Sequence, residues 1–461
     1  MTGRRTVAWA VLGGAGRQSN AAAAGETHRS APAHGGARRS LRSNFSWTLL
    51  GSLAYSGGNW IQLAALTKAL GPADVGSFAF ALALSAPIMI FLALGLRTVQ
   101  VTDATSDHAF GDYLTIRTAL SVIGVGLVVG IAVAGGYARS DVLTISAIAV
   151  AKALDGVSDI VYGLFQRAEQ MDVSAKAMMI NSVVSTGLVV ALVMTTKSVV
   201  WAAIGVALGS AAALVAYALP AGRVLHARSD GGDPSLALGF RLLWRPRRLL
   251  SLICVAAPLG LASLLTSLNP NIPRFVIERD LGRYELGIYA ALASILVIGT
   301  TLMGSLVQAV LPRLTSAFVA ADRSAFTRLI VTLLTVAVAL GAAGVVAVAV
   351  VGEPVVAVLF TDEYARDSAL LVWLSVALAL GLVVYILDVG MSAARRFQIQ
   401  VPINLATVAF SLVGSLLLIE RYGIAAAGAI LSLSLALQVV MKAVVLGRSI
   451  RSLVPATGLP G

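Results

Sequence analysis

A stripe of polar side chains crosses an otherwise apolar stretch, residues 142–165. Lys152, Asp155, Asp159, Tyr162 and Gln166 follow one another at spacings of 3, 4, 3 and 4 residues, which places them on one face of a helix. An ionised side chain in the middle of a bilayer costs roughly 3 kcal/mol or more unless it is paired or hydrated. The stripe therefore predicts either a water-filled cavity or a tight internal network of ions.

Two interpretations of these charges stay open. Lys152 and Asp155 can neutralise each other as an i,i+3 pair that only locks helix packing. That pairing leaves Asp159 without a partner in the stripe, and a lone carboxylate is a natural carrier for a coupling proton or cation. Together with Asp388, which lies in a later apolar stretch, Asp155 and Asp159 are the candidate coupling-ion residues.

Polar residues at helical spacing recur in two other apolar stretches. The first stripe is Ser52, Tyr55, Asn59 and Gln62, and the second is Ser263, Ser267, Asn271 and Arg274. Such residues either line a cavity or mediate ordinary helix packing in a membrane. Arg274 comes directly after Asn269-Pro270-Asn271-Ile272-Pro273, where the prolines are expected to end the helix near the outer surface.

Arginine and lysine at these places point to the binding of an anionic head group such as pyrophosphate, because guanidinium groups bind phosphate oxygens bidentately. Arg97 and Arg274 are expected at opposite mouths of a path, with Lys152 between them; the alternative for both arginines is that they reach to the membrane interface. The candidate substrate-binding residues are Arg97, Lys152, Arg274, Asn59, Gln62, Asn269, Asn271 and Gln308.

The composition requires a membrane around these residues. Hydrophobic residues make up 58% of the 461 positions and charged residues 12%, which is more apolar surface than a soluble protein of this size could bury. The spans must be helices, because lipid offers backbone groups no hydrogen-bond partners. About twelve are expected, at residues 46–67, 76–96, 114–136, 142–165, 174–196, 199–220, 249–271, 285–310, 326–351, 368–390, 400–419 and 423–446.

An internal repeat relates the two halves at a shift of 211 residues. Leu70-Gly71 and Gly76 match Leu281-Gly282 and Gly287, and Arg117 matches Arg328. The abundance of Leu, Gly and Ala leaves chance matching as an alternative. A shift of six spans preserves orientation, so the fold class is an all-α membrane protein with two parallel-repeat six-helix lobes and a substrate path between them. The expected boundaries are a disordered basic tail at 1–45, lobes at 46–220 and 249–446, a basic linker at 221–248 and a tail at 447–461.

The net charge of +12 reflects how the chain is oriented in the membrane. The arginines fall in short loops between apolar stretches and form no single solvated patch, so nucleic acid is not an expected partner. The positive-inside rule then places both termini and the 221–248 linker in the cytoplasm, and the acidic loop with Glu353, Asp362 and Glu363 outside.

Several kinds of chemistry have no counterpart in the sequence. There is no Gly-x-x-x-x-Gly-Lys-Ser/Thr loop for ATP, no His/Cys cluster with metal-ligand spacing, and a single cysteine, Cys254, which has no partner for an intrachain disulfide. We therefore expect no cofactor, no metal and no enzymatic activity.

The chain resembles the polysaccharide transporter branch of the multidrug/oligosaccharidyl-lipid/polysaccharide exporter superfamily, the Wzx-type oligosaccharide flippases. The resemblance runs through most of residues 44–445. The positions that carry it are Asn44, Leu70-Gly71-Pro72 with Gly76, Gly95-Leu96-Arg97, Asp155 to Met171 (DGVSDIVYGLFQRAEQM), Pro258, Pro273-Arg274, Leu281-Gly282 with Gly287-Ile288-Tyr289, Pro312-Arg313-Leu314, Glu363-Tyr364 and Gly423 to Gly428.

The resemblance implies two six-helix lobes arranged as a V around a cationic cavity in the inner membrane. It also implies alternating access on undecaprenyl-pyrophosphate glycans for surface polysaccharide, with membrane lipids, a polysaccharide polymerase and other assembly proteins as further candidate partners. Two alternatives stay open: a cation-coupled multidrug exporter of the same superfamily, for which Asp155, Asp159 and Asp388 would make the cavity acidic, and a non-transporting membrane scaffold for a polysaccharide assembly complex.

Overall fold

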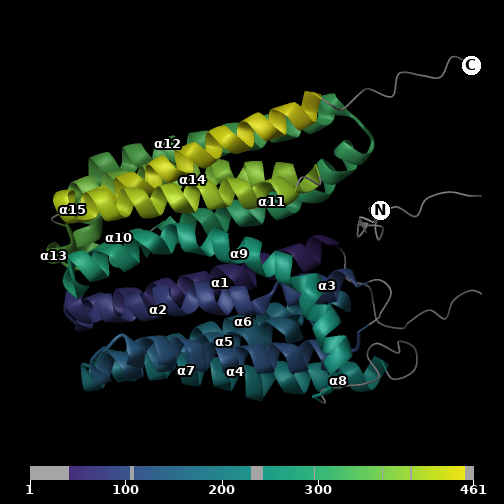
Figure 1. The fold of residues 1–461 in the computed structure, drawn as a ribbon, viewed down its shortest axis with the longest axis horizontal. Coiled ribbons are helices and arrows are strands. Elements are labelled where there is room, and N and C mark those ends of the chain that lie inside the picture. The colour runs from purple at the N-terminus through teal and green to yellow at the C-terminus, as the bar shows by residue number, and fades with distance from the viewer. Residues whose placement is uncertain are drawn as a thin grey trace, which may run out of the picture. The chain divides into compact units, whose positions relative to one another are not determined.

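The computed structural model describes residues 41–103, 108–229, 242–294, 296–365, 367–394 and 397–451, and every regular element in these ranges is a helix (Figure 1). Most of the expected N-terminal tail, the middle of the 221–248 linker and the last ten residues lie outside the described residues. The boundaries of those three segments therefore stay predictions.

The described residues of the first half form eight α-helices and one short π-helical turn. They are α1 (Leu41–Ala69), α2 (Pro72–Ala93), α3 (Leu96–Thr102), α4 (Phe110–Ala134), α5 (Arg139–Arg167), α6 (Met171–Thr196) and α7 (Val199–Ala213), which continues through the π-helical turn η1 (Leu214–Ala218) into α8 (Leu219–Ser229). Pro72 begins α2 at its first position, where its missing N–H would have had no partner anyway.

The second half contributes α9 (Pro246–Asp280), α10 (Arg283–Ser294), α11 (Leu296–Val319), α12 (Arg323–Leu359), the short α13 (Asp362–Ala365), α14 (Ser368–Ala393) and α15 (Phe397–Arg451). In Figure 1, α11, α12, α14 and α15 lie together above α9 and α10, while α1, α2 and α4 to α8 lie below them. The long α15 is two helices joined at Gly423, whose φ of 69° breaks the helical path and is available to glycine at little cost.

Nine helices of the described residues are long and apolar enough to cross a membrane. α1 and α5 are also long enough but fall outside this set, and they are the helices that carry the Tyr55 and Asp155 stripes. The stretch counted as one span at Gln398–Arg451 is about 80 Å long at 1.5 Å per residue, so it crosses twice around Gly423. These helices confirm the predicted fold class, an all-α membrane protein of about twelve spans.

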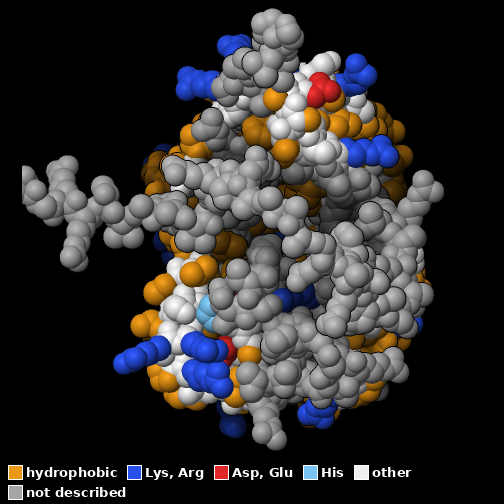
Figure 2. Space-filling model, turned by 90° about the vertical axis from the view of Figure 1, so that its right-hand side faces the viewer, with side chains coloured by type: hydrophobic (Ala, Val, Ile, Leu, Met, Phe, Trp, Pro, Cys, Tyr) orange, Lys and Arg blue, Asp and Glu red, His pale blue; other side chains and the backbone are white. Residues whose placement is uncertain are grey.

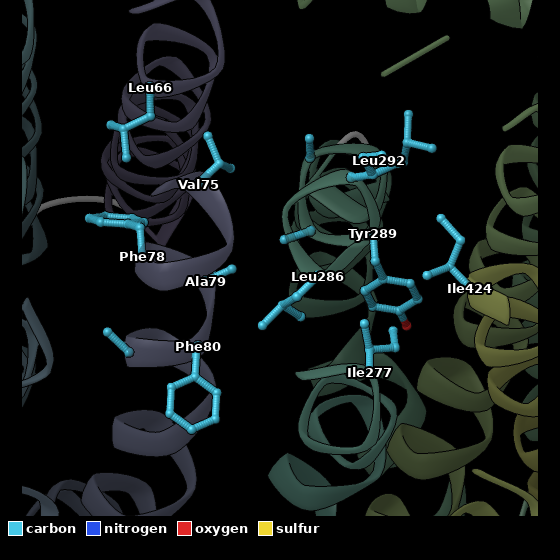
Figure 3. Close-up of a cluster of buried hydrophobic side chains, with 14 of the residues drawn as sticks. Leu66, Val75, Phe78, Ala79, Phe80, Ile277, Leu286, Tyr289, Leu292 and Ile424 are labelled. Carbon is cyan, nitrogen blue, oxygen red and sulfur yellow. The ribbon is translucent and has the colours of Figure 1, made fainter. Parts of the chain in front are cut away.

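The two lobes share one apolar core at one end of the helices only. We call this the closed end; it carries the α1–α2 and α9–α10 turns. Its core joins Leu66, Val75 and Phe78 from the first lobe to Leu286 and Tyr289 from the second. Figure 3 shows the side chains of α2 facing Leu286 of α10, and Tyr289 turned toward Ile424 of α15.

At the opposite end the apolar cores are separate. One contains first-lobe residues together with Leu249, Leu252 and Ala256 from the start of α9, and two others contain only residues of the second lobe. Figure 2 looks onto this end and shows Lys and Arg side chains around its rim. The lobes are therefore sealed together at the closed end and packed independently at the other, apart from α9.

Two glycines allow the backbones of the two lobes to approach closely. A Cβ on Gly76 of α2 would overlap the carbonyl oxygen of Arg283, and a Cβ on Gly287 of α10 would overlap that of Pro72. Both pairs, Pro72 with Arg283 and Gly76 with Gly287, differ by the shift of 211 residues found in the sequence. The repeat is therefore real in space, and its two copies meet each other at the closed end through equivalent positions.

Replacing either glycine is expected to open this contact. Gly76→Ala and Gly287→Ala each place a methyl group where the facing backbone stands, and overpacking of this kind costs about 1–3 kcal/mol. We expect a lower melting temperature in detergent. Gly126→Ala on α4 is the matched control, because its Cβ would meet open space and alanine favours a helix; equal melting temperatures for all three variants would contradict the close contact.

Candidate functional site

Asp155 is the centre of a polar network inside the first lobe. Its Oδ2 accepts hydrogen bonds from the Tyr55 hydroxyl at 3.0 Å and from Lys152 Nζ at 3.2 Å. Its Oδ1 accepts from the Ser210 hydroxyl at 2.8 Å and from Asn181 Nδ2 at 3.2 Å. These donors come from α1, α5, α7 and α6, so one carboxylate holds four helices together. The geometry favours the packing interpretation for the Lys152–Asp155 pair.

Asp159 is not the lone carboxylate expected from the sequence. Its Oδ1 lies 2.8 Å from Arg97 Nη1, and Gln166 Oε1 accepts from Nε and Nη2 of the same arginine at 3.1 and 3.0 Å. The expectation was wrong because Arg97 lies 62 residues away and reaches α5 only through the fold. The side chains of Arg97 and Asp159 are 32% and 44% exposed, so this pair is accessible while Asp155 is enclosed.

A break between α2 and α3 delivers Arg97 to α5. Leu94 and Gly95 adopt positive φ angles of 51° and 61°, which end α2 and restart the chain in a new direction. α3 then packs on α5 where Gly163 leaves room for the side chains of Gln100 and Arg97. Three of the five guanidinium N–H groups of Arg97 are bonded within the described residues, so two remain for a ligand.

Arg117 on α4 belongs to this charged group, although we did not predict it as a site residue. Its side chain is buried, its guanidinium packs against Gly156 of α5, and it interacts electrostatically with Asp159 and Asp155. The repeat match to Arg328 was the only signal in the sequence, and Arg328 is exposed in the second lobe. The repeat thus has an arginine at both positions, but Arg117 is buried and Arg328 is exposed.

The second lobe has its own ion pair. Asp388 on α14 lies 2.7 Å from Lys442 on α15, and Lys442 is almost fully buried. Lys442 also donates to Gln438 at 3.2 Å, which in turn donates to Thr407 at 2.9 Å. Lys442 was missed because it stands close to the end of an expected span, where a lysine usually reaches the interface. Asp388 is therefore neutralised inside the lobe.

Arg274 lies inside a continuous helix, in its last third. The expectation that Pro270 and Pro273 end this helix was wrong: α9 runs on to Asp280 with both prolines inside it. Proline is tolerated within membrane helices because neighbouring groups satisfy the freed backbone carbonyls. Arg274 Nη1 donates to Asn271 at 3.2 Å, its Nε is buried without a partner, and no acid of the described residues pairs with it.

The other predicted residues divide between packing and the helix surface. Gln62 is buried and donates to Ser185 at 2.9 Å and Thr186 at 3.2 Å, and Asn269 donates to Ser434 at 3.3 Å, so both tie neighbouring helices together as in the packing alternative. Asn59 is exposed on α1. Gln308 lies on α11, and its side chain is outside the described part of the protein.

A charged clamp closes the interface between the lobes at the closed end. Arg283 of α10 donates to Asp141 of the first lobe at 2.9 Å, to Ser77 at 2.8 Å and to Glu278 of α9 at 3.1 Å. Its guanidinium also lies 4.8 Å from the centre of the Phe80 ring. Only 17% of the Arg283 side chain is exposed, so solvent screens these contacts weakly.

The three ion pairs of Asp155, Asp159 and Asp388 described above, together with Arg117 and Arg274, comprise five cations and three acids. Each of these acids has a cation as its direct partner, which leaves Arg117 and Arg274 without an ion pair of their own among the described residues. Arg117 still interacts with Asp159 and Asp155, whereas no acid of the described part of the chain is found beside Arg274. A site of this kind attracts anions and repels cations.

Comparison with known proteins identifies the family. Residues 41–318, more than half of the chain, match the model of the family described as polysaccharide biosynthesis protein. The chain belongs to this family. The capsular polysaccharide biosynthesis protein CapF of Staphylococcus aureus is 24% identical over 393 residues, which cover 85% of this chain and 95% of CapF. This member of the polysaccharide biosynthesis family is a multi-pass membrane protein.

Solved structures show the same fold for this family member. Outward- and inward-facing multidrug resistance MATE transporters of the MOP superfamily align with TM-scores of 0.60 and 0.59 at 15% and 14% identity, and cover 89% and 90% of the chain and 96% of each transporter. A MOP superfamily transporter from Pyrococcus furiosus, whose binding pocket is described as having reverse polarity, aligns at 0.58 and 12% identity over 89% of the chain and 97% of its own length. At these identities the likeness shows the fold alone.

Removing the charge of Asp155 is expected to destabilise the first lobe strongly. Asp155→Asn leaves Lys152 without its counter-ion in an enclosed site, and breaking a buried ion pair costs about 3–5 kcal/mol. Asp159→Asn should lower the melting temperature much less, because Asp159 is 44% exposed. A thermal melt of both purified variants tests this order, and an equal or smaller effect of Asp155→Asn would contradict it.

Breaking the clamp is expected to open the closed end. Arg283→Ala leaves Asp141 and Glu278 facing each other without a cation. In a Cys254→Ser background, a cysteine at the buried Ala79 should then react several times faster with a membrane-impermeant maleimide. Arg279→Ala is the control, because Arg279 is exposed and pairs only with its neighbour Asp280 among the described residues. Unchanged labelling after Arg283→Ala would show that the clamp does not hold the lobes.

Proposed function

We propose that this protein flips a polyprenyl-pyrophosphate-linked oligosaccharide across the cytoplasmic (inner) membrane by alternating access, for surface polysaccharide biosynthesis. Membership of the polysaccharide biosynthesis family and the capsular relative support a lipid-linked glycan, such as an undecaprenyl-pyrophosphate glycan, as the substrate. The transporter fold supports translocation over synthesis.

The uncompensated Arg274 is the observation that carries this proposal. A guanidinium within a membrane protein that has no acid nearby and an unbonded Nε is energetically costly, and a bound anion would offset that cost. Pyrophosphate supplies the acceptor oxygens that a forked N–H pair binds best. Asn271 holds Arg274 in place from one turn away, and Ser267 in turn accepts the Asn271 amide through its backbone carbonyl.

Arg97 and Asp159 supply the second step of the proposal. A pyrophosphate that reaches Arg97 competes with Asp159 for the same guanidinium, because both are anionic acceptors. The released Asp159 then gains a proton or a cation from the accessible side. In this way binding of the head group would be coupled to ion uptake, while Asp155 and Asp388 hold neighbouring helices together inside their lobes.

The distribution of charged residues between the two ends of the helices supports an orientation of the protein in the membrane. Helix ends at the end opposite the clamp carry the arginines Arg167, Arg223, Arg245, Arg247, Arg248, Arg313, Arg323 and Arg448. The closed end carries the acids Asp74, Asp141, Glu278, Asp280, Glu285, Glu353, Asp362 and Glu363. Under the positive-inside rule, the closed end lies outside and both termini lie in the cytoplasm. The described conformation is then sealed outward and ready to receive a substrate made in the cytoplasm.

The ion pairs of the three acids also argue against the alternative of a cation-coupled multidrug exporter. Asp155, Asp159 and Asp388 would have to attract a cationic drug, and all three are paired with cations of the protein. A cationic drug would meet Arg274 without an acid to balance it. The pairing pattern therefore favours an anionic substrate over a cationic one.

Transport by purified protein in liposomes tests the proposal. With a fluorescent undecaprenyl-pyrophosphate glycan, Arg274→Ala should reduce flipping at least about tenfold, because a hydrogen bond to a charged group contributes roughly 1.5–3 kcal/mol. Arg274→Lys should retain part of the activity, since it keeps the charge without the fork. The melting temperature of Arg274→Ala should stay the same or rise, because a cation without a partner is removed.

The exposed Arg279→Ala variant is again the control and should flip lipid at the wild-type rate. Flipping that survives Arg274→Ala, or wild-type protein that moves a lipophilic cation and no glycolipid, would refute the proposed function.

A further inference from the structure

A cavity of about 460 Å³ lies between α2, α9 and α15. Its polar wall consists of Ser263, Thr266, Ser267, Gln400 and Asn404, and the rest of its lining is aliphatic. The volume is within the range of small-molecule sites, about 300–1,000 Å³. Because α2 belongs to the first lobe and the other two helices to the second, the cavity lies on the interface between the lobes.

No side chain that lines this cavity is charged, which separates it from the arginine sites. Hydroxyl and amide groups both donate and accept hydrogen bonds, as the hydroxyl and acetamido groups of sugars do. A pyrophosphate would find no cation here. The chemistry of the wall therefore suits an uncharged, hydroxyl-rich ligand.

Two hydroxyls of the wall are free to bind. Most Ser and Thr hydroxyls of these helices donate to a carbonyl one turn back, as Thr266 does to Ala262 at 3.0 Å. Within the described residues the hydroxyls of Ser263 and Ser267 have no hydrogen-bond partner. Asn404 donates to Thr266 at 3.2 Å and so fixes the neighbouring wall.

The repeat shows that the opening is specific to this side of the molecule. The shift of 211 residues relates Ser267 to Ser56 and Ile90 to Thr301. In the related crossing of α1 and α11, Thr301 donates to Ser56 at 3.2 Å and the helices touch. At the α9 and α2 crossing, Ile90 and Ser267 stand on the wall of the cavity. Two equivalent crossings are thus built differently, one closed and one hollow.

The cavity lies in line with the proposed pyrophosphate site. Ser263, Ser267, Asn271 and Arg274 occupy one face of α9, and Arg274 is about 10 Å further along the helix than Ser267 at 1.5 Å per residue. That distance is of the order of one sugar ring beyond a pyrophosphate. A head group bound through its phosphates at Arg274 would therefore place its first sugars at this wall.

We infer that the cavity is a glycan subsite, in which Ser263, Ser267 and Gln400 bind the uncharged sugars attached to the pyrophosphate. The inference rests on the proposed function, which supplies the pyrophosphate anchor at Arg274. It assigns selection for the glycan to α9 and α15, and selection for the charged linkage to the arginines.

Binding to purified full-length protein tests the assignment with two probes. One is the lipid-linked glycan extracted from a host strain that lacks this gene, and the other is bare undecaprenyl pyrophosphate. Ser267→Leu fills the cavity without removing an existing hydrogen bond of its hydroxyl, and Gln400→Leu removes the amide. Each should weaken binding of the glycan-bearing lipid about tenfold and leave binding of the bare lipid within twofold.

Thr335→Leu on the exposed face of α12 is the matched hydroxyl-to-leucine control and should change neither affinity. Melting temperatures confirm that all variants fold. Equal losses for both lipids, or no loss for either, would overturn the glycan subsite while the proposed function stands. Wild-type protein that binds neither lipid would overturn both.

Discussion

The fold depends on how charged side chains are accommodated within a bilayer. Three acids inside the lobes each have a cation within hydrogen-bonding distance: Asp155 has Lys152, Asp159 has Arg97, and Asp388 has Lys442. Asp155 connects four helices of the first lobe, and the Asp388–Lys442 pair joins α14 to α15, so these two act as structural contacts. The Arg97–Asp159 pair is more exposed, and in the proposed function a ligand displaces Asp159 from Arg97. Arg274 has no acid of the described residues beside it, and the anionic head group of the proposed substrate would balance its charge.

The lobes are joined unequally along their length. At the closed end they share a single apolar core, a pair of repeat-related glycine contacts and the Arg283 clamp. At the other end their cores are separate, with the start of α9 attached to the first lobe. Two rigid lobes that meet at one end can rock about that contact, which is the geometry alternating access requires. α9 crosses between the lobes, and its three prolines are suited to bending as they move.

The two lobes are related by the internal repeat, but some repeat-related positions have different surroundings, and the candidate site residues are among them. The glycine contacts at Gly76 and Gly287 obey the repeat closely, because both lobes need the same close approach. Arg117 is buried while its counterpart Arg328 is exposed, and the hollow crossing at Ser267 corresponds to a closed one at Ser56. A symmetric pair of lobes thus encloses an asymmetric interior, as an asymmetric head group would need.

The all-helical membrane fold, the repeat and the polar faces of α1, α5 and α9 followed from the sequence, since helical spacing and the cost of charge in lipid are local properties of the chain. Partners across the fold did not. Arg97 pairs with Asp159 because positive φ angles at Leu94 and Gly95 redirect the chain, Lys442 reaches Asp388 from a different helix, and α9 continues through Pro270 and Pro273 because neighbouring helices support it. Whether a polar residue packs, forms an ion pair or has no partner depends on the side chains that neighbouring helices place beside it. The spacing of residues along one helix does not contain that information.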